Sequence, residues 1–130
     1  MSDHSPPDRL GRRWPPQVYG VGDEPDPRFT FANERTFLAW IRTGLGFLAA
    51  GVAIAAVARL TDRLGLEVRL AAVILVLCGL GCGIGAFVRW AANERAMRLG
   101  QPLPSSRMLL ALTAVVAAVG IVAIVVVSLA

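Results

Sequence analysis

The chain has 130 residues, of which 55% are hydrophobic and 17% are charged, and its formal net charge is +4. All 13 Lys and Arg positions are arginine, and they are scattered between apolar stretches, which argues against a nucleic-acid-binding protein. Three stretches carry no charge: 43–58, 70–88 and 108–130, of 16, 19 and 23 residues. A hydrocarbon core about 30 Å thick needs roughly 20 apolar residues in a helix, so the composition indicates an integral membrane protein.

Residues that support enzyme chemistry are scarce. His4 is the single histidine and lies in the polar N-terminal segment, whereas Cys78 and Cys82 lie four residues apart in an apolar stretch. This spacing fits neither a CxxC redox pair nor a zinc site, and it places two small side chains on one helix face. Because no nucleophile–base pair or phosphate-binding loop is evident, we expect no enzyme activity, no cofactor and no bound metal.

The N-terminal segment and the first helix differ sharply in character. Residues 1–26 contain five prolines and mixed charges with little periodicity, so we expect a disordered cytoplasmic tail. Asp26 followed by Pro27 predicts a helix start, and the helix can continue to residue 58 without an internal proline. Such a helix is about 48 Å long. Its amphipathic first part should therefore either project beyond the membrane on the cytoplasmic side or bend into the interface before the first span, at about 40–58.

The second and third spans are predicted at about 70–88 and 108–129, with a polar helical extension following the second. The fold class is therefore all-α, a transmembrane domain of three helices over residues 27–130. Seven arginines flank the first span and the 89–107 loop, against three in the 59–69 turn. The positive-inside rule then predicts a cytoplasmic N-terminus and a C-terminus outside.

Two patterns mark the predicted cytoplasmic side. Arginines 28, 35 and 42 recur every seven residues, so they form one helical stripe, which either binds anions or consists of side chains that snorkel to the interface. The tetrapeptide Ala-Asn-Glu-Arg occurs at 32–35 and again at 92–95. The two copies form either a polar collar between two helices or ordinary interfacial ion pairs. Glu34 is the acidic partner that we expect for the first-span arginines.

Glycines alternate through the second span. They produce a GxGxxA match, but a dinucleotide site needs a preceding strand and a soluble crevice, and neither is predicted here. Small residues allow close approach of helices in membranes, so we predict a helix-packing face. The predicted packing residues are Gly79, Gly81, Gly83 and Gly85. The third span is rich in β-branched residues and is expected to face lipid.

Residues 26–44, DPRFTFANERTFLAWIRTG, closely resemble the opening of the YidH-type domain of unknown function, found in small bacterial inner-membrane proteins. The resemblance covers about residues 26–130 and implies a location in the bacterial inner (plasma) membrane. A more distant similarity is to the small membrane subunit of the fungal vacuolar transporter chaperone, a polyphosphate-synthesising complex. Its family members form a pentameric bundle around a polyphosphate path with a basic cytosolic side. This chain lacks a soluble polymerase domain, so any synthesis would need a separate protein.

The arginine stripe and the glycine faces need partner helices, so we predict a homo-oligomer, pentameric if the resemblance holds. The leading functional prediction is a basic collar or conduit for a polyanion such as polyphosphate, or for acidic lipid head groups. The alternative is a structural or accessory subunit that scaffolds a partner protein. The predicted binding residues, some of them carried over from the resemblance, are Arg28, Glu34, Arg35, Arg42, Arg89, Arg95, Arg98 and Arg107.

Overall fold

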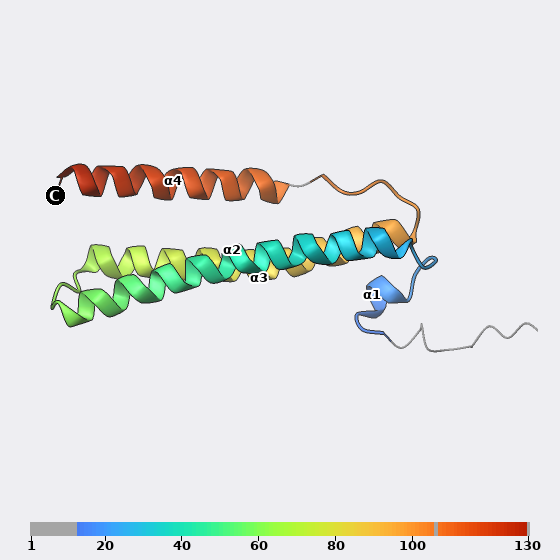
Figure 1. Cartoon of the computed structure of the whole chain (residues 1–130), viewed down its shortest axis with the longest axis horizontal. Coiled ribbons are helices and arrows are strands. Elements are labelled where there is room, and N and C mark those ends of the chain that lie inside the picture. The colour runs from blue at the N-terminus through green and yellow to red at the C-terminus, as the bar shows by residue number, and fades with distance from the viewer. Residues whose placement is uncertain (1–12, 106, 130) are drawn as a thin grey trace, which may run out of the picture.

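The computed structural model describes residues 13–105 and 107–129, and these contain only helices as regular secondary structure. The helices are α1 (Pro16–Tyr19), α2 (Pro27–Leu60), α3 (Leu66–Arg98) and α4 (Arg107–Leu129). α2 and α3 form an antiparallel hairpin, and α4 runs alongside it at a distance (Figure 1). Three of the helices are long and apolar enough to cross a membrane, which confirms the all-α prediction with three candidate spans.

The start of α2 is set by its local sequence. The Asp26 side chain accepts a hydrogen bond from the backbone N–H of Arg28 at 2.9 Å, and Pro27 occupies the first helical position. The carboxylate thus satisfies one of the free N–H groups at the helix start. The predicted start is confirmed, and the helix continues for 34 residues. At 1.5 Å per residue α2 is about 51 Å long, so about 20 Å extends beyond a hydrocarbon core.

A stripe of small residues joins α2 to α3. The buried positions recur at intervals of four or seven along α2, and of three or four between Ala72 and Ala86 of α3, which is the spacing of two helices wound around one another. Most of these positions are glycine, alanine or cysteine, so the two backbones can approach closely. The members of the stripe are Gly44, Gly51, Ala58, Ala72, Gly79, Cys82 and Ala86.

Gly44 and Gly79 face one another across the hairpin. A Cβ atom on Gly44 would lie 3.0 Å from the carbonyl oxygen of Gly79, and one on Gly79 would lie 2.7 Å from that of Gly44. The prediction of a packing role thus fits Gly79. Gly85 faces Met108 of α4, whereas a Cβ atom on Gly81 or Gly83 would meet no other helix within 4 Å. The alternation of glycines covers two faces of α3, and only one of them faces α2.

Helix α4 has a different environment from the hairpin. None of its most apolar window is buried within the chain, compared with 28% of the corresponding window in α3. A helix that is apolar on all sides gains little by leaving lipid for another apolar surface. This burial pattern fits the expectation of a lipid-facing third span.

The N-terminal segment differs from the expectation of a disordered tail over 1–26. Residues 1–12 lie outside the described residues. Residues 13–24, here called the strap, include α1 and lie against the last turns of α3, with Val18 only 2% exposed. Gly22 has a positive φ of 60°, and a Cβ atom there would lie 1.9 Å from the carbonyl oxygen of Arg98. The backbone thus meets α3 where only glycine fits.

The hairpin contact makes a prediction about stability. We expect Gly44→Leu to lower the free energy of unfolding by about 1–3 kcal/mol, because the larger side chain separates two backbones in contact. Thermal unfolding of the purified protein in maltoside micelles measures this loss.

Gly46→Leu is the matched control, since it adds the same side chain to the same helix where a Cβ atom meets nothing within 4 Å. Equal melting temperatures for the two variants would show that the Gly44–Gly79 contact does not hold the hairpin together.

Candidate functional site

The two copies of Ala-Asn-Glu-Arg meet across the hairpin. Glu94, from the second copy, is 1% exposed. It accepts hydrogen bonds from the hydroxyl of Thr30 at 2.9 Å and from the amide Nδ2 of Asn33 at 3.3 Å. Nδ2 of Asn33 also donates to the carbonyl oxygen of Trp90 at 3.1 Å, and Asn93 donates to Oδ1 of Asn33 at 3.3 Å. We call Thr30, Asn33, Asn93 and Glu94 the polar lock.

The polar lock revises the role given to the acidic residues. Glu34 was the acidic partner expected for the first-span arginines, but the carboxylate that is buried between the two helices is that of Glu94. A buried carboxylate is costly unless it accepts hydrogen bonds, and the lock supplies neutral donors to both of its oxygens. Among the ion pairs between described residues, none includes Glu94 or Glu34. The arginines of α2 therefore have no carboxylate partner across the hairpin.

Arg98 holds the strap against α3. Its guanidinium donates to the carbonyl oxygens of Val21 at 2.9 Å and Tyr19 at 3.1 Å, and to the carboxylate of Glu24 at 3.2 Å. Only 4% of the Arg98 side chain is exposed. Arg98 was predicted to bind a polyanion, but its donors are occupied by the chain itself. The five donors of a guanidinium suit it to this clamp.

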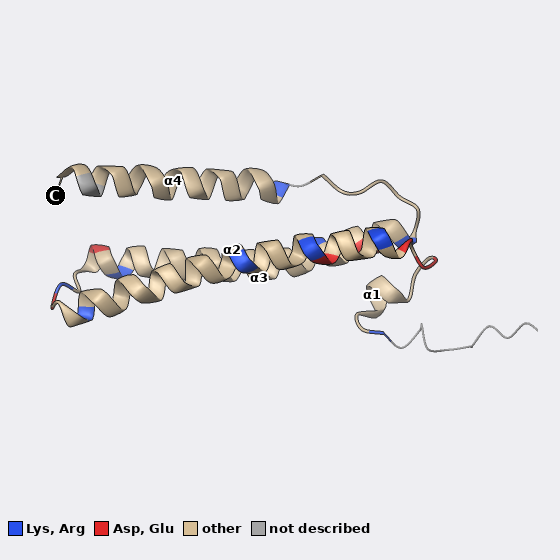
Figure 2. Cartoon of the chain, viewed as in Figure 1, with Lys and Arg blue, Asp and Glu red and all other residues tan. Residues whose placement is uncertain are grey.

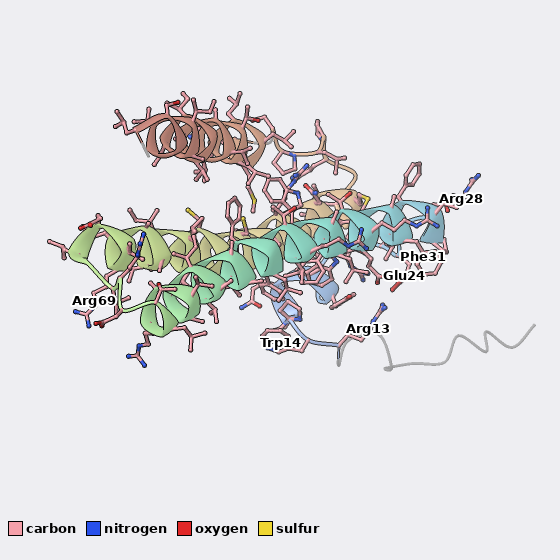
Figure 3. The ribbon with its side chains drawn as sticks, turned by 60° about the vertical axis from the view of Figure 1, so that its left-hand side comes forward. Arg13, Trp14, Glu24, Arg28, Phe31 and Arg69 are labelled. Atoms are coloured by element: carbon pink, nitrogen blue, oxygen red, sulfur yellow. The ribbon has the colours of Figure 1, made fainter. Side chains whose placement is uncertain are left out.

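The strap carries further charged and aromatic contacts. Glu24 also pairs with Arg13, and the hydrogen bonds from Arg13 and Arg98 hold the pKa of the Glu24 carboxyl below its ordinary value. Burial raises the pKa of the Tyr19 hydroxyl, and the negative charges of Glu94 and Glu34 raise it further. In Figure 3, Arg13 and Glu24 lie near one end of the hairpin and Arg69 lies at the other.

Charged residues gather where α2 begins, α3 ends and α4 begins (Figure 2). We call this the charged end. A smaller group lies at the turn between α2 and α3, and α4 carries no charge after Arg107 among its described residues. The chain therefore has two polar ends separated by apolar helix, as a membrane-spanning hairpin requires.

A groove of about 270 Å³ lies between α3 and the beginning of α4. Arg89 and Arg107 both line it, together with the polar side chains of Asn93 and Ser105. No acidic residue within the described part of the chain lines it. The guanidinium carbon of Arg89 also lies 5.7 Å from the centre of the Trp40 ring, a cation–π arrangement that fixes its position. We call this the arginine groove.

The other predicted binding residues are spread over the charged end. Arg28 pairs with Asp26 at 3.0 Å, and Arg95 donates to the carbonyl oxygen of Gln17 at 2.7 Å. Arg35 and Arg42 are exposed and belong to no ion pair between described residues. The fold brings Arg89 and Arg107 to one groove, whereas Arg95 and Arg98 form a second pair in that both donate to the strap. The stripe on α2 converges with neither pair.

Comparisons with known proteins identify the family of the chain. The family model "Domain of unknown function (DUF202)" matches residues 28–96, which contain both tetrapeptide copies and nearly the whole hairpin. This chain belongs to the DUF202 family. Inner membrane protein YidH of Escherichia coli K12 is 43% identical over 107 residues, which cover 82% of this chain and 91% of that protein.

A second relative comes from another bacterium. An uncharacterized protein of Mycobacterium tuberculosis H37Rv is 49% identical over 81 residues, covering 62% of this chain and 66% of that protein. No solved structure matches the chain significantly. The resemblance to the YidH-type family predicted from residues 26–44 is thereby confirmed.

The strap should respond to acid. Because the pKa of Glu24 is lowered in the folded chain, its carboxylate stabilises the strap at neutral pH, and this is lost as the pH falls through the lowered pKa. We expect the methyl resonances of Val18, buried at neutral pH, to shift to solvent-exposed positions at that step. NMR spectra of methyl-labelled protein across acidic pH measure the change.

Glu24→Gln should lack this pH step, whereas Glu67→Gln, which changes an acid at the far end of the hairpin, should keep it. An unchanged step in Glu24→Gln would assign the acid sensitivity to another carboxyl group.

Proposed function

We propose that the chain is a bacterial inner-membrane protein whose charged end faces the cytoplasm and binds phosphate-bearing anions. The ligand is a polyanion such as polyphosphate or the head group of an acidic phospholipid. The observation that supports this most directly is the arginine groove. It places Arg89 and Arg107, from two different helices, around one space whose described lining has no acid.

The groove has the chemistry that phosphate recognition needs. A guanidinium presents a planar set of donors that matches two oxygens of a phosphate. The Ser105 hydroxyl adds a neutral donor at the same groove. The groove also lies at the start of α4, where the aligned peptide dipoles make the potential more positive. Arg35 and Arg42 add exposed positive charge nearby along α2, so the charged end attracts anions over a wider area.

The proposed orientation follows from the arginine distribution. More of the described arginines lie at the charged end than at the turn between α2 and α3, where Arg59, Arg63 and Arg69 lie. Positive residues near spans are retained in the cytoplasm. The cytoplasmic leaflet is also the one whose acidic lipids attract arginine. In a homo-oligomer, a pentamer for example, the grooves of neighbouring copies would form a basic collar.

The second candidate is an accessory subunit that scaffolds a partner protein. The unburied surface of α4 favours it, because a helix with 0% of its apolar window buried within the chain has room for a partner helix. The two candidates differ in a measurable property. A collar binds phosphate in the purified protein, whereas a scaffold binds only its partner.

The orientation predicts a labelling pattern in intact cells. In a variant with Cys78 and Cys82 replaced by alanine, Thr61→Cys should react with a membrane-impermeant maleimide, because the turn lies outside. Gln101→Cys should react only after the cells are lysed. Both positions are exposed and uncharged, so neither change alters the arginine balance. The reverse pattern would place the charged end outside the cytoplasm.

The arginine groove predicts a loss of anion binding. We expect Arg89→Gln with Arg107→Gln to weaken binding of polyphosphate or phosphatidylglycerol vesicles by about thirtyfold at low salt, since each of the two lost ion pairs near a surface contributes roughly 1 kcal/mol. The remaining affinity should depend less on salt than that of the wild type. Binding isotherms at two salt concentrations measure both quantities, and the two ligands are titrated separately.

The matched control is Arg59→Gln with Arg63→Gln, which removes the same charge at the other end of the hairpin. Equal losses of affinity in the two double variants would show that the effect comes from net charge alone and not from the groove. If the wild type bound neither ligand, the accessory-subunit candidate would be the one supported.

A further inference from the structure

A second concave site at the charged end has the opposite chemistry to the arginine groove. It is a pocket of about 350 Å³ lined by Glu34, Phe37 and Leu38 of α2 and by Phe87 and Trp90 of α3. It shares no lining residue with the arginine groove. We call it the aromatic pocket. Its volume lies in the range of small-molecule sites, roughly 300–1,000 Å³.

The walls of the aromatic pocket are held from outside it. The Phe87 and Trp90 rings lie 5.7 Å apart between centroids. Trp14 of the strap stacks on Phe87 at 5.8 Å, and Tyr19 packs against Trp90 at 6.1 Å. Arg98 fixes the strap through the carbonyl oxygen of Tyr19. The rings are thus supported before any ligand arrives, which lowers the ordering cost of binding.

The charge of the aromatic pocket comes from Glu34. Its side chain is exposed and takes part in no ion pair between described residues. A carboxylate at the pocket repels phosphate and attracts a cation. Three aromatic rings favour the same sign, since the face of an aromatic ring carries negative potential.

The kind of cation follows from the lining. Apart from Glu34, the lining side chains are Phe37, Leu38, Phe87 and Trp90, which provide a single N–H donor and no further side-chain oxygen. A metal ion or a primary ammonium needs several oxygen acceptors to replace its water. An ammonium whose hydrogens are replaced by alkyl groups needs none and is recognised by rings beside one carboxylate.

We propose that the aromatic pocket binds quaternary ammonium groups, with Glu34 supplying the charge and Phe37, Phe87 and Trp90 supplying the aromatic walls. The group can belong to a free organic cation or to the choline head group of a lipid, because the pocket lies at the charged end beside the apolar part of the hairpin. This site is independent of the proposed phosphate binding, and it would stand if the arginine groove bound nothing.

The test is a titration of the full-length protein in maltoside micelles, which carry no charge and no choline. Tetramethylammonium chloride is added while tryptophan fluorescence is followed, and potassium chloride at equal ionic strength is the reference. We expect a saturable change with tetramethylammonium alone. Glu34→Gln should weaken the apparent affinity about tenfold, and Phe37→Leu should weaken it about threefold or more.

Matched controls separate the pocket from general effects. Glu67→Gln removes an equal charge at the far end of the hairpin, and Phe31→Leu removes an aromatic ring that is 57% exposed on α2. Both should bind as the wild type does. Helix content and elution volume are measured for every variant. If Phe37→Leu is misfolded, the result for Glu34→Gln decides the test. The Glu34 side chain is exposed, and glutamine has nearly the same shape as glutamate.

Nanodiscs distinguish the two sources of the quaternary ammonium group, a free cation and a lipid head group. If lipid choline occupies the pocket, phosphatidylcholine discs should suppress the tetramethylammonium response that phosphatidylglycerol discs retain. If the ligand is a free cation, both discs should give a response that Glu34→Gln reduces. A wild-type response no different from that to potassium chloride, or an equal loss in Glu67→Gln, would overturn the proposal.

Discussion

The direct contact of two helix backbones at Gly44 and Gly79 is the constraint on which the charged end depends. It fixes both the distance and the register of α2 and α3, since the glycines face one another across the interface. The register continues without a break from Gly51 beside Ala72 to Thr30 beside Glu94. A slip of one residue would rotate Asn33 away from Glu94 and leave a buried carboxylate without donors, which is costly. Apolar packing and polar pairing thus select the same alignment.

The sequence predicted what depends on local composition. The helix start at Asp26–Pro27 follows from capping, and the three spans follow from apolar length. It did not distinguish Glu34 from Glu94, because the two lie in identical tetrapeptides and only the rotation of each helix separates them. The spacing of the small residues could have identified Glu94 as the acid between the helices. The stripe through Gly44 and Gly51 extends back to Asn33, and the stripe through Gly79 and Ala86 extends forward to Glu94.

The path of the strap could not be predicted, for a different reason. Its position depends on backbone carbonyl oxygens that accept hydrogen bonds from Arg98. Every residue has a backbone carbonyl, so the sequence does not show which of them accept. The five prolines of residues 1–26 suggest a chain with no regular structure, and the described part indeed has one short helix. Non-repetitive structure held by one buried arginine therefore resembles disorder when only composition and periodicity are read.

The excess of positive charge at the charged end follows from how its acids are used. Glu94 is committed to the polar lock, Glu24 to Arg13 and Arg98, and Asp26 to the start of α2. Each of these acids secures a piece of structure, so none is free to neutralise Arg89 or Arg107. Two further described acids lie at this end: Asp23 is in the strap, and Glu34 lines a pocket that the two groove arginines do not line.

This distribution of charge affects the position of helix α4. An all-apolar helix gains little by packing on the hairpin in lipid, so its position depends on the few groups at its start. Those groups include Met108, which lies near Gly85, and Arg107, which shares the arginine groove with Arg89. Two guanidinium groups at one groove repel each other until an anion lies between them. If the groove binds phosphate as proposed, its occupation and the approach of α4 to the hairpin would be linked, because one phosphate would relieve the repulsion and contact both helices.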